Sequence, residues 1–274
     1  MVVNSRRIGR AAIQVVLFGF AFLTFFPVLI LLSLSVKNLD QFNNQPLGLT
    51  FPLHFENYSM AWNVMTEPII HNVIVAGVAT FLSILMGGLA AFVFARFKFP
   101  FRRLLFGALL FNLVVPSTIL LVPTFQLIVQ FNLQNTLWAL ILPYAAHQSL
   151  IIFVLYSFFA ELPGEMFEAA TIDGARVLDL FWRIAVPLAL PAISAMAIFQ
   201  VWIIWNDYAW PVLVANSPGS RTVAAGLIFF NDFSRPEPGA GMAAAVIAAL
   251  PVALLFLATM RTFIAGMTAG SVKE

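Results

Sequence analysis

The residues best suited to a specific interaction stand in one short run, from Glu168 to Ala175, which combines acids, small side chains and a glycine. Pro163 suits the first turn of a helix, and Glu165 favours the positive N-terminal end of that helix. Gly174 allows the helix to stop after about three turns. A short amphipathic helix in a polar loop of an otherwise apolar chain predicts docking to a partner protein.

A second helix is expected to begin after this turn, with Asp173 near its start. Ala169 and Ala170 would leave a face without bulk. The alternative is a helix that lies on lipid, which favours a broad basic polar face. Here the helix opens with acids instead, which favours protein docking. The acids are Glu161, Glu165 and Glu168, and apolar contacts would come from Met166, Phe167 and Ile172.

Catalytic chemistry has little support in the residue types. The chain has no cysteine, which excludes disulfides, thiolate metal sites and cysteine nucleophiles. No lysine follows the glycine spacing of a phosphate-binding loop, so we expect no nucleotide hydrolysis by that route. The histidines are scattered, and no two carboxylates sit at helical spacing inside an apolar segment. We therefore expect no catalytic residue, no metal and no cofactor bound by this chain.

Composition places the chain in a bilayer, since 61% of its 274 residues are hydrophobic, 9% are charged and the mean hydropathy is +0.95. We expect an all-α transmembrane fold forming a single domain over residues 1–274. A cytoplasmic loop that carries the docking helix is expected at 160–184. The expected spans lie at about 11–36, 71–95, 104–129, 136–159, 185–214 and 242–264.

Basic residues fall mostly on one side of these spans, which by the positive-inside rule places both termini in the cytoplasm of a multi-pass protein of the plasma or inner membrane. The formal net charge is only +2, so nucleic acid is not an expected partner. Two loops, at about 37–70 and 215–241, are expected on the outer side. The basic residues expected on the outer side are Lys37, Arg221 and Arg235. Those expected on the cytoplasmic side are Arg6, Arg7, Arg10, Arg96, Lys98, Arg102, Arg103, Arg176, Arg183, Arg261 and Lys273.

The acidic run resembles the signature of inner-membrane permease subunits of binding-protein-dependent ATP-binding-cassette (ABC) importers, which is Glu-Ala-Ala, three residues, then Gly. Here the signature residues are Glu168, Ala169, Ala170, Asp173 and Gly174. Further marks point to the carbohydrate, or maltose-type, branch, although Glu274 stands where that family commonly ends in Gly. These marks are Asn57-Tyr58, Arg96 to Pro100, Pro116 with Pro123, Trp205-Asn206-Asp207 with Trp210-Pro211, and Gly266 to Lys273.

The resemblance implies a six-helix type I ABC importer permease in which the signature helix couples to an ATPase. It also implies a homologous second permease subunit, two ABC ATPase subunits that bind ATP and Mg, and an extracytoplasmic solute-binding protein. The chain would form half of the translocation path for a sugar or oligosaccharide by alternating access. The C-terminal tail, through Gly270 and Lys273, would reach the ATPase dimer interface.

Four residues of the fifth expected span are candidates for the translocation path, because aromatic faces stack on sugar rings and amide or carboxylate groups bond hydroxyls. They are Gln200, Trp205, Asn206 and Asp207. Alternatively, the tryptophans form an aromatic belt and Asp207 locks a helix end. Other interpretations are an importer of glycerol 3-phosphate or a related polyol, an ion-coupled secondary transporter, a membrane enzyme and a structural subunit.

Overall fold

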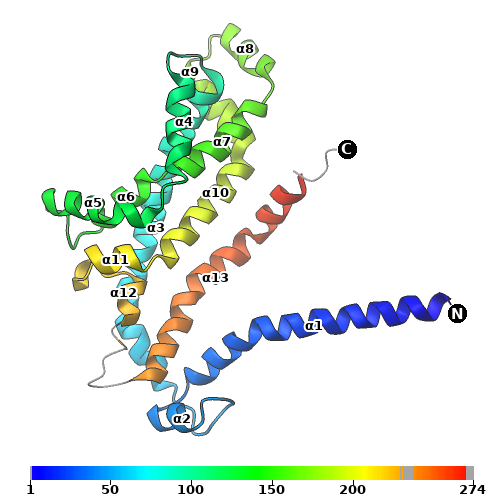
Figure 1. Cartoon of the computed structure of the whole chain (residues 1–274), viewed down its shortest axis with the longest axis vertical. Coiled ribbons are helices and arrows are strands. Elements are labelled where there is room, and N and C mark those ends of the chain that lie inside the picture. Colours follow the sequence, from blue (N-terminus) through cyan, green and yellow to red (C-terminus); the bar gives the residue numbers. More distant parts are fainter. Residues whose placement is uncertain (1, 229, 231–236, 270–274) are drawn as a thin grey trace. The chain divides into compact units, whose positions relative to one another are not determined.

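The structure is a computed structural model that describes residues 2–228, 230 and 237–269, with side chains described from Ile13 to Met260 apart from the gaps. Every regular element in these ranges is helical (Figure 1), as expected for an all-α membrane protein. The elements are α1 (Val2–Leu34), α2 (Leu39–Asn44), α3 (Glu56–Arg96), α4 (Arg102–Asn112), α5 (Ser117–Gln130), α6 (Trp138–Ala146), α7 (Ser149–Glu161), α8 (Gly164–Ile172), α9 (Val177–Asp179), the π-helix η1 (Leu180–Ala185), α10 (Val186–Asn206), α11 (Ala209–Val214), the 3₁₀ helix η2 (Pro218–Ser220), α12 (Val223–Ile228) and α13 (Pro238–Ala269).

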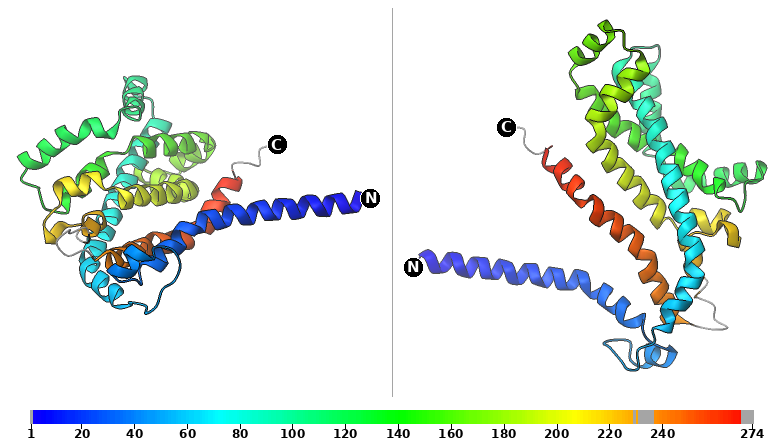
Figure 2. Two further views of the ribbon diagram at one scale, coloured as in Figure 1. Left: turned by 60° about the horizontal axis from the view of Figure 1, so that its bottom comes forward. Right: turned by 180° about the vertical axis from the view of Figure 1, so that it is seen from behind.

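The described chain divides into two compact units. Unit 1 comprises Met1–Thr66 and Gly226–Leu250, and unit 2 comprises Glu67–Ala225 and Pro251–Glu274. Within unit 2, α8 lies at one end, whereas α5, α6 and α11 lie toward the other (Figures 1 and 2). Two apolar cores hold unit 2 together, one near each of these ends.

Proline positions break several of the expected spans. The span expected at 104–129 consists of α4 and α5, which meet at an angle of 98°. Pro116 has no N–H to continue the helix and biases the residue before it toward extended backbone. The span expected at 136–159 is similarly divided into α6 and α7, at 42°. By length and composition, the described residues contain four membrane-crossing helices, or six if each bent pair counts as one span.

Three other expected boundaries were wrong. The outer loop expected at 37–70 ends early, because α3 begins at Glu56. Polar residues in its first turns kept this part of the helix out of an apolar window that marks only the lipid-crossing region. The span expected at 185–214 stops at Asn206, since Pro211 cannot donate a helical hydrogen bond. The last helix begins at Pro238 instead of 242, with proline at a position that it favours.

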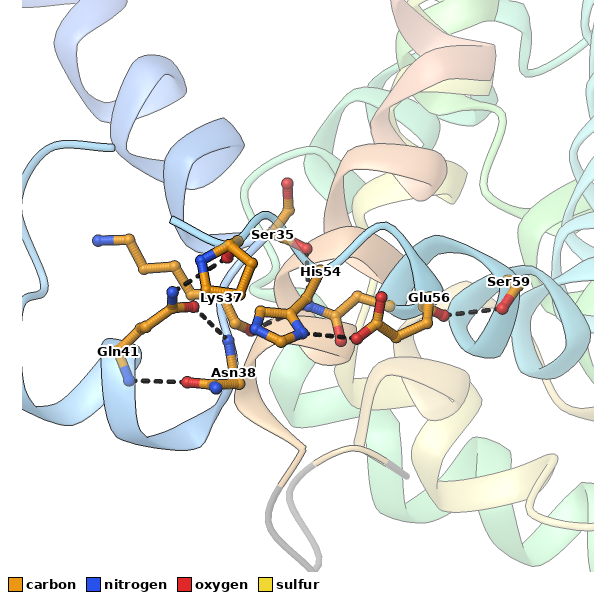
Figure 3. A network of polar contacts seen from close by, with 9 residues as sticks. Ser35, Lys37, Asn38, Gln41, His54, Glu56 and Ser59 are labelled. Carbon is orange, nitrogen blue, oxygen red and sulfur yellow. Dashed lines mark hydrogen bonds and ion pairs between the residues drawn. The ribbon is translucent and has the colours of Figure 1, made fainter. Parts of the chain in front are cut away.

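In unit 1, the segment between α1 and α3 is folded by polar contacts (Figure 3). The Asn57 amide donates to the carbonyl oxygens of Ser35 at 3.0 Å and Lys37 at 2.9 Å. Lys37 is only 1% exposed, and its ammonium donates to the carbonyls of Gln45 and Pro46. Lys37, which was counted among the basic residues of the outer side, is therefore buried and stabilises the fold of this loop.

Another close contact in unit 1 leads to a prediction. A Cβ on Gly239 would overlap the Lys37 carbonyl oxygen and the Asn57 side-chain amide. We expect Gly239→Ala to lower the unfolding temperature clearly, because a helix turn and a loop would have to separate. Gly77→Ala is the matched control, since a Cβ there meets nothing within 4 Å. Thermal unfolding in detergent would test this, and equal unfolding temperatures for the two variants would contradict it.

Candidate functional site

The acidic run forms α8, a nine-residue helix that follows Pro163 and has Glu165 in its first turn. The helix ends in a Schellman motif, in which the Gly174 N–H donates to Thr171 O at 3.0 Å and the Ala175 N–H to Ala170 O at 2.9 Å. Gly174 has a φ of +84°, a conformation that suits glycine. The turn predicted at Gly174 is therefore present.

The position expected for Asp173 was wrong. Asp173 caps the C-terminal end of α8, where its N–H donates to Ala169 O at 3.0 Å, and does not begin the next helix. That role falls to Arg176, the N-cap of α9, whose N–H donates to the Asp179 carboxylate at 3.2 Å. The Schellman turn occupies residues 173–175, so the next helix starts later than the acid.

An aromatic cluster anchors α8 to the body of unit 2. Phe167 is 7% exposed, and its ring centroid lies 6.1 Å from that of Phe92 in α3. Phe92 also packs against Phe159 of α7 at 5.9 Å and Phe181 of η1 at 5.5 Å. One side chain of α8 thus contacts a cluster to which α3, α7 and η1 all contribute.

Arg96, the last residue of α3, supports the same anchor. Its guanidinium carbon lies 4.1 Å from the centre of the Phe167 ring, in a cation–π contact. Its Nη2 donates to the Leu162 carbonyl oxygen at 2.6 Å, just before α8 begins. Arg96 therefore holds both the start of the helix and the ring that anchors it.

The remaining face of α8 is exposed. Glu168 and Ala169 are exposed, Ala170 is half-buried against the cluster, and Ile172 is 87% exposed. An isoleucine with so little cover on a short, anchored helix is suited to apolar contact with another protein, and the acids Glu165 and Glu168 would add charge selection.

A second candidate site is a cavity of about 530 Å³ in unit 2, a volume typical of small-molecule sites. It lies at the break between α4 and α5 and extends to α6, α10 and α11. Its polar lining residues include Asn112, Ser117, Thr118, Thr124, His147 and Ser149, with Tyr144, Gln200, Asp207 and Trp210 beside them.

Tyr144 of α6 is the centre of the polar wall of this cavity. Its hydroxyl donates to the Asp207 carboxylate at 2.8 Å. Its carbonyl oxygen accepts from the Gln200 amide at 3.3 Å and from the Ser83 hydroxyl at 3.2 Å. The other Asp207 oxygen accepts from the Trp210 N–H at 3.4 Å. Asp207 is thus the C-cap residue of α10, its carboxylate also accepts a bond from the first turn of α11, and it lines the cavity.

The structure separates the four path candidates. Gln200 and Asp207 line the cavity, whereas Trp205 is buried and Asn206 is exposed, donating to the Trp202 carbonyl at 2.8 Å. Sequence reasoning missed Tyr144, because its bonds join residues about sixty positions apart. The only available signal was a tyrosine within an apolar span.

Gly270 and Lys273 lie outside the described residues. In the described part of the chain, no group of three or more His, Asp or Glu side chains is placed to hold a metal ion.

Comparison with known proteins identifies the class. The chain belongs to the family of binding-protein-dependent transport system inner membrane components, whose family model matches residues 79–268. The resemblance inferred from the signature run is thereby confirmed, and membership of this family indicates transport instead of catalysis.

Two curated relatives match most of the chain. The diacetylchitobiose uptake system permease protein NgcG of Streptomyces coelicolor is 33% identical over 89% of this chain and 83% of that protein. The melibiose/raffinose/stachyose import permease protein MelC of Bacillus subtilis is 32% identical over 91% of each.

The fold is shared with a solved structure. In the crystal structure of a bacterial ABC transporter that imports the acidic polysaccharide alginate, one chain matches with a TM-score of 0.81 and 17% identity. The match covers 94% of this chain and 98% of that one. The all-α membrane permease fold is thereby confirmed.

Proposed function

We propose that this chain is one of two permease subunits of an ATP-driven importer and forms half of the translocation path for a sugar or oligosaccharide. The substrates in the names of the relatives, diacetylchitobiose and the melibiose series, support the carbohydrate class. The observation that carries the coupling role is α8, which exposes Ile172 and Glu168 while Phe167 fixes it to the core.

The other subunits follow from this proposal. A homologous second permease completes the path, and two ABC ATPase subunits bind ATP and Mg and receive α8. An extracytoplasmic binding protein delivers the sugar. In this proposal the chain itself binds no cofactor, and Gly270 and Lys273 provide contacts with the ATPases.

The mechanism converts ATPase closure into a movement of helices. A rigid-body shift of α8 would act through Phe167 on Phe92, Phe159 and Phe181, and so on the ends of α3, α7 and η1. Because packed aromatic rings resist compression, these ends would move together. Switching the cavity between inward and outward access would follow from this movement.

Purification from native membranes tests the assembly. A tagged chain is expected to co-purify with a second permease and an ABC ATPase. Proteoliposomes containing this complex and its binding protein should take up at least one of melibiose, raffinose, stachyose and diacetylchitobiose when ATP is present. Uptake driven by an ion gradient without ATP would instead support the secondary-transporter interpretation.

The proposed orientation gives a separate prediction. In this cysteine-free chain, Asn43→Cys is expected to react with an impermeant thiol reagent in sealed cells, and Lys98→Cys only after permeabilisation. Both side chains are exposed, so their intrinsic access is comparable. Labelling of the Lys98→Cys variant in sealed cells would overturn the cytoplasmic placement of the termini.

A further inference from the structure

In the part of the chain that the structure describes, the cavity in unit 2 is lined by an acidic side chain and by no lysine or arginine. Of the described residues that line it, Asp207 is the only acid, and none is Lys or Arg. The one other lining side chain that can carry charge near neutral pH is His147, whose Nδ1 donates to the Pro143 carbonyl oxygen at 3.0 Å. A ligand held in this cavity therefore meets a carboxylate with no strongly basic side chain beside it.

Asp207 still has capacity to bind a ligand. One carboxylate oxygen accepts from the Tyr144 hydroxyl and the other from the Trp210 N–H. Each oxygen has two lone pairs, so one acceptor position remains on each for a ligand hydroxyl. The Trp210 side chain is also fixed, because its Nε1 donates to the Ala139 carbonyl at 3.0 Å. Because Trp210 is only 7% exposed, its indole supports the wall of the cavity, and it is the free lone pairs of Asp207 that suit a ligand carrying hydroxyl groups.

We propose that this cavity is a binding subsite for a neutral sugar and that Asp207 excludes acidic sugars and sugar or polyol phosphates. The proposal rests on the proposed function of sugar import and assigns the charge of the substrate at one place in the path. An anionic group would face the carboxylate in a partly desolvated site, where like charges repel strongly.

Charge selection of this kind is not dictated by the fold. The solved transporter with the matching fold imports alginate, an acidic polysaccharide. The side chains that line the cavity, and not the arrangement of helices, would therefore set the preference of this chain. Glycerol 3-phosphate, the alternative substrate considered from the sequence, carries the charge that this lining disfavours.

Protection of an introduced cysteine can measure binding at the cavity without the binding protein, which has a selectivity of its own. Thr118 lines the cavity and is exposed. The chain has no native cysteine, so a cysteine introduced at this position would be its only thiol. The membrane complex of the two permeases and the ATPases, with Thr118→Cys and without the binding protein, would be labelled in nanodiscs in the presence of each sugar, at pH 8 to limit histidine protonation. The probes are the four neutral sugars of the uptake experiment and the matched pair cellobiose and cellobiouronic acid.

We expect at least one neutral sugar to slow labelling and cellobiouronic acid to require at least about tenfold higher concentration than cellobiose. Asp207→Asn should reduce this difference to about threefold or less, because the amide oxygen can still accept a hydrogen bond while the charge is lost. Asp40→Asn makes the same charge change at an exposed position of unit 1 and should leave the difference intact.

Tyr144→Phe supplies a second variant if the first fails to assemble. It keeps the carboxylate and should keep the discrimination. The proposal is overturned if no neutral sugar protects, if the two members of the pair protect equally, or if Asp207→Asn discriminates like the parent. ATP-dependent uptake is measured separately, so absence of charge selection in the parent complex, with intact uptake, would remove this inference and leave the importer function standing.

Discussion

Phe167→Ala is expected to abolish ATP-driven uptake while the ATPase subunits remain bound. The ring is the side chain of α8 that enters the aromatic cluster, and Arg96 lies over its face at 4.1 Å. Truncating a buried phenylalanine typically costs about 3–5 kcal/mol, enough to free a nine-residue helix from its support. The exposed docking face, with Glu168 and Ile172, would be unchanged.

The measurement is sugar uptake together with the amount of ATPase that co-purifies. Phe167→Leu should recover part of the uptake, since it refills the apolar site without the cation–π contact. Phe111→Ala is the matched control, because that ring is 69% exposed in α4. Normal uptake by Phe167→Ala in a fully assembled complex would show that the cluster does not transmit ATPase movement.

Gly174→Pro is expected to reduce uptake by at least about tenfold and to release the ATPase subunits. Proline fixes φ near −65°, whereas this residue has φ of +84°. It would also remove the N–H that donates to Thr171 O in the Schellman turn. The end of α8 would have to unwind or change direction, so Ile172 and Glu168 would no longer face the partner together.

Gly174→Asn separates conformation from the loss of a donor. Asparagine accepts the left-handed region more readily than other side chains and keeps the N–H, so we expect it to retain most of the uptake. Gly164→Pro lies at the other end of α8, where proline is compatible with a first helical position and a Cβ meets nothing within 4 Å. Equal activity of Gly174→Pro and Gly164→Pro would contradict the importance of the turn.

Helix α8 was the most predictable part of the chain, because local chemistry determines it. Pro163, Glu165 and Gly174 mark its two ends without reference to any distant residue. The orientation of the helix could not be predicted in the same way. Phe167 and Ile172 were equivalent as apolar contacts in the sequence, yet one is buried and the other is 87% exposed. The difference depends on Phe92 and Phe159, which are distant in sequence.

The cavity was predicted less well than the helix, for the same reason. Gln200 and Asp207 were identified from their polar character in an apolar span, but Asn206 shares that character and faces elsewhere. Gln200 and Asp207 are seven positions apart and share a helical face that Asn206 does not, so helical spacing, unlike polar character, separates them. Tyr144 enters the site only through contacts that the folded chain creates.

In the proposed mechanism, η1 and α10 would carry movement from the aromatic cluster to the cavity, and this helical stretch contains a flexible region near the cluster. Phe181 and Gln200 are nineteen positions apart, roughly 28 Å at the usual helical rise, so a tilt of about 10° at one end would displace the other by roughly 5 Å. The π-helix η1 and two prolines, Pro187 and Pro191, lie close to the cluster end of this stretch. The missing N–H donors of the prolines weaken the helical hydrogen bonding there. Bending in this region would absorb part of any movement that starts at the cluster. Stiffening the region should therefore increase the displacement that reaches Gln200.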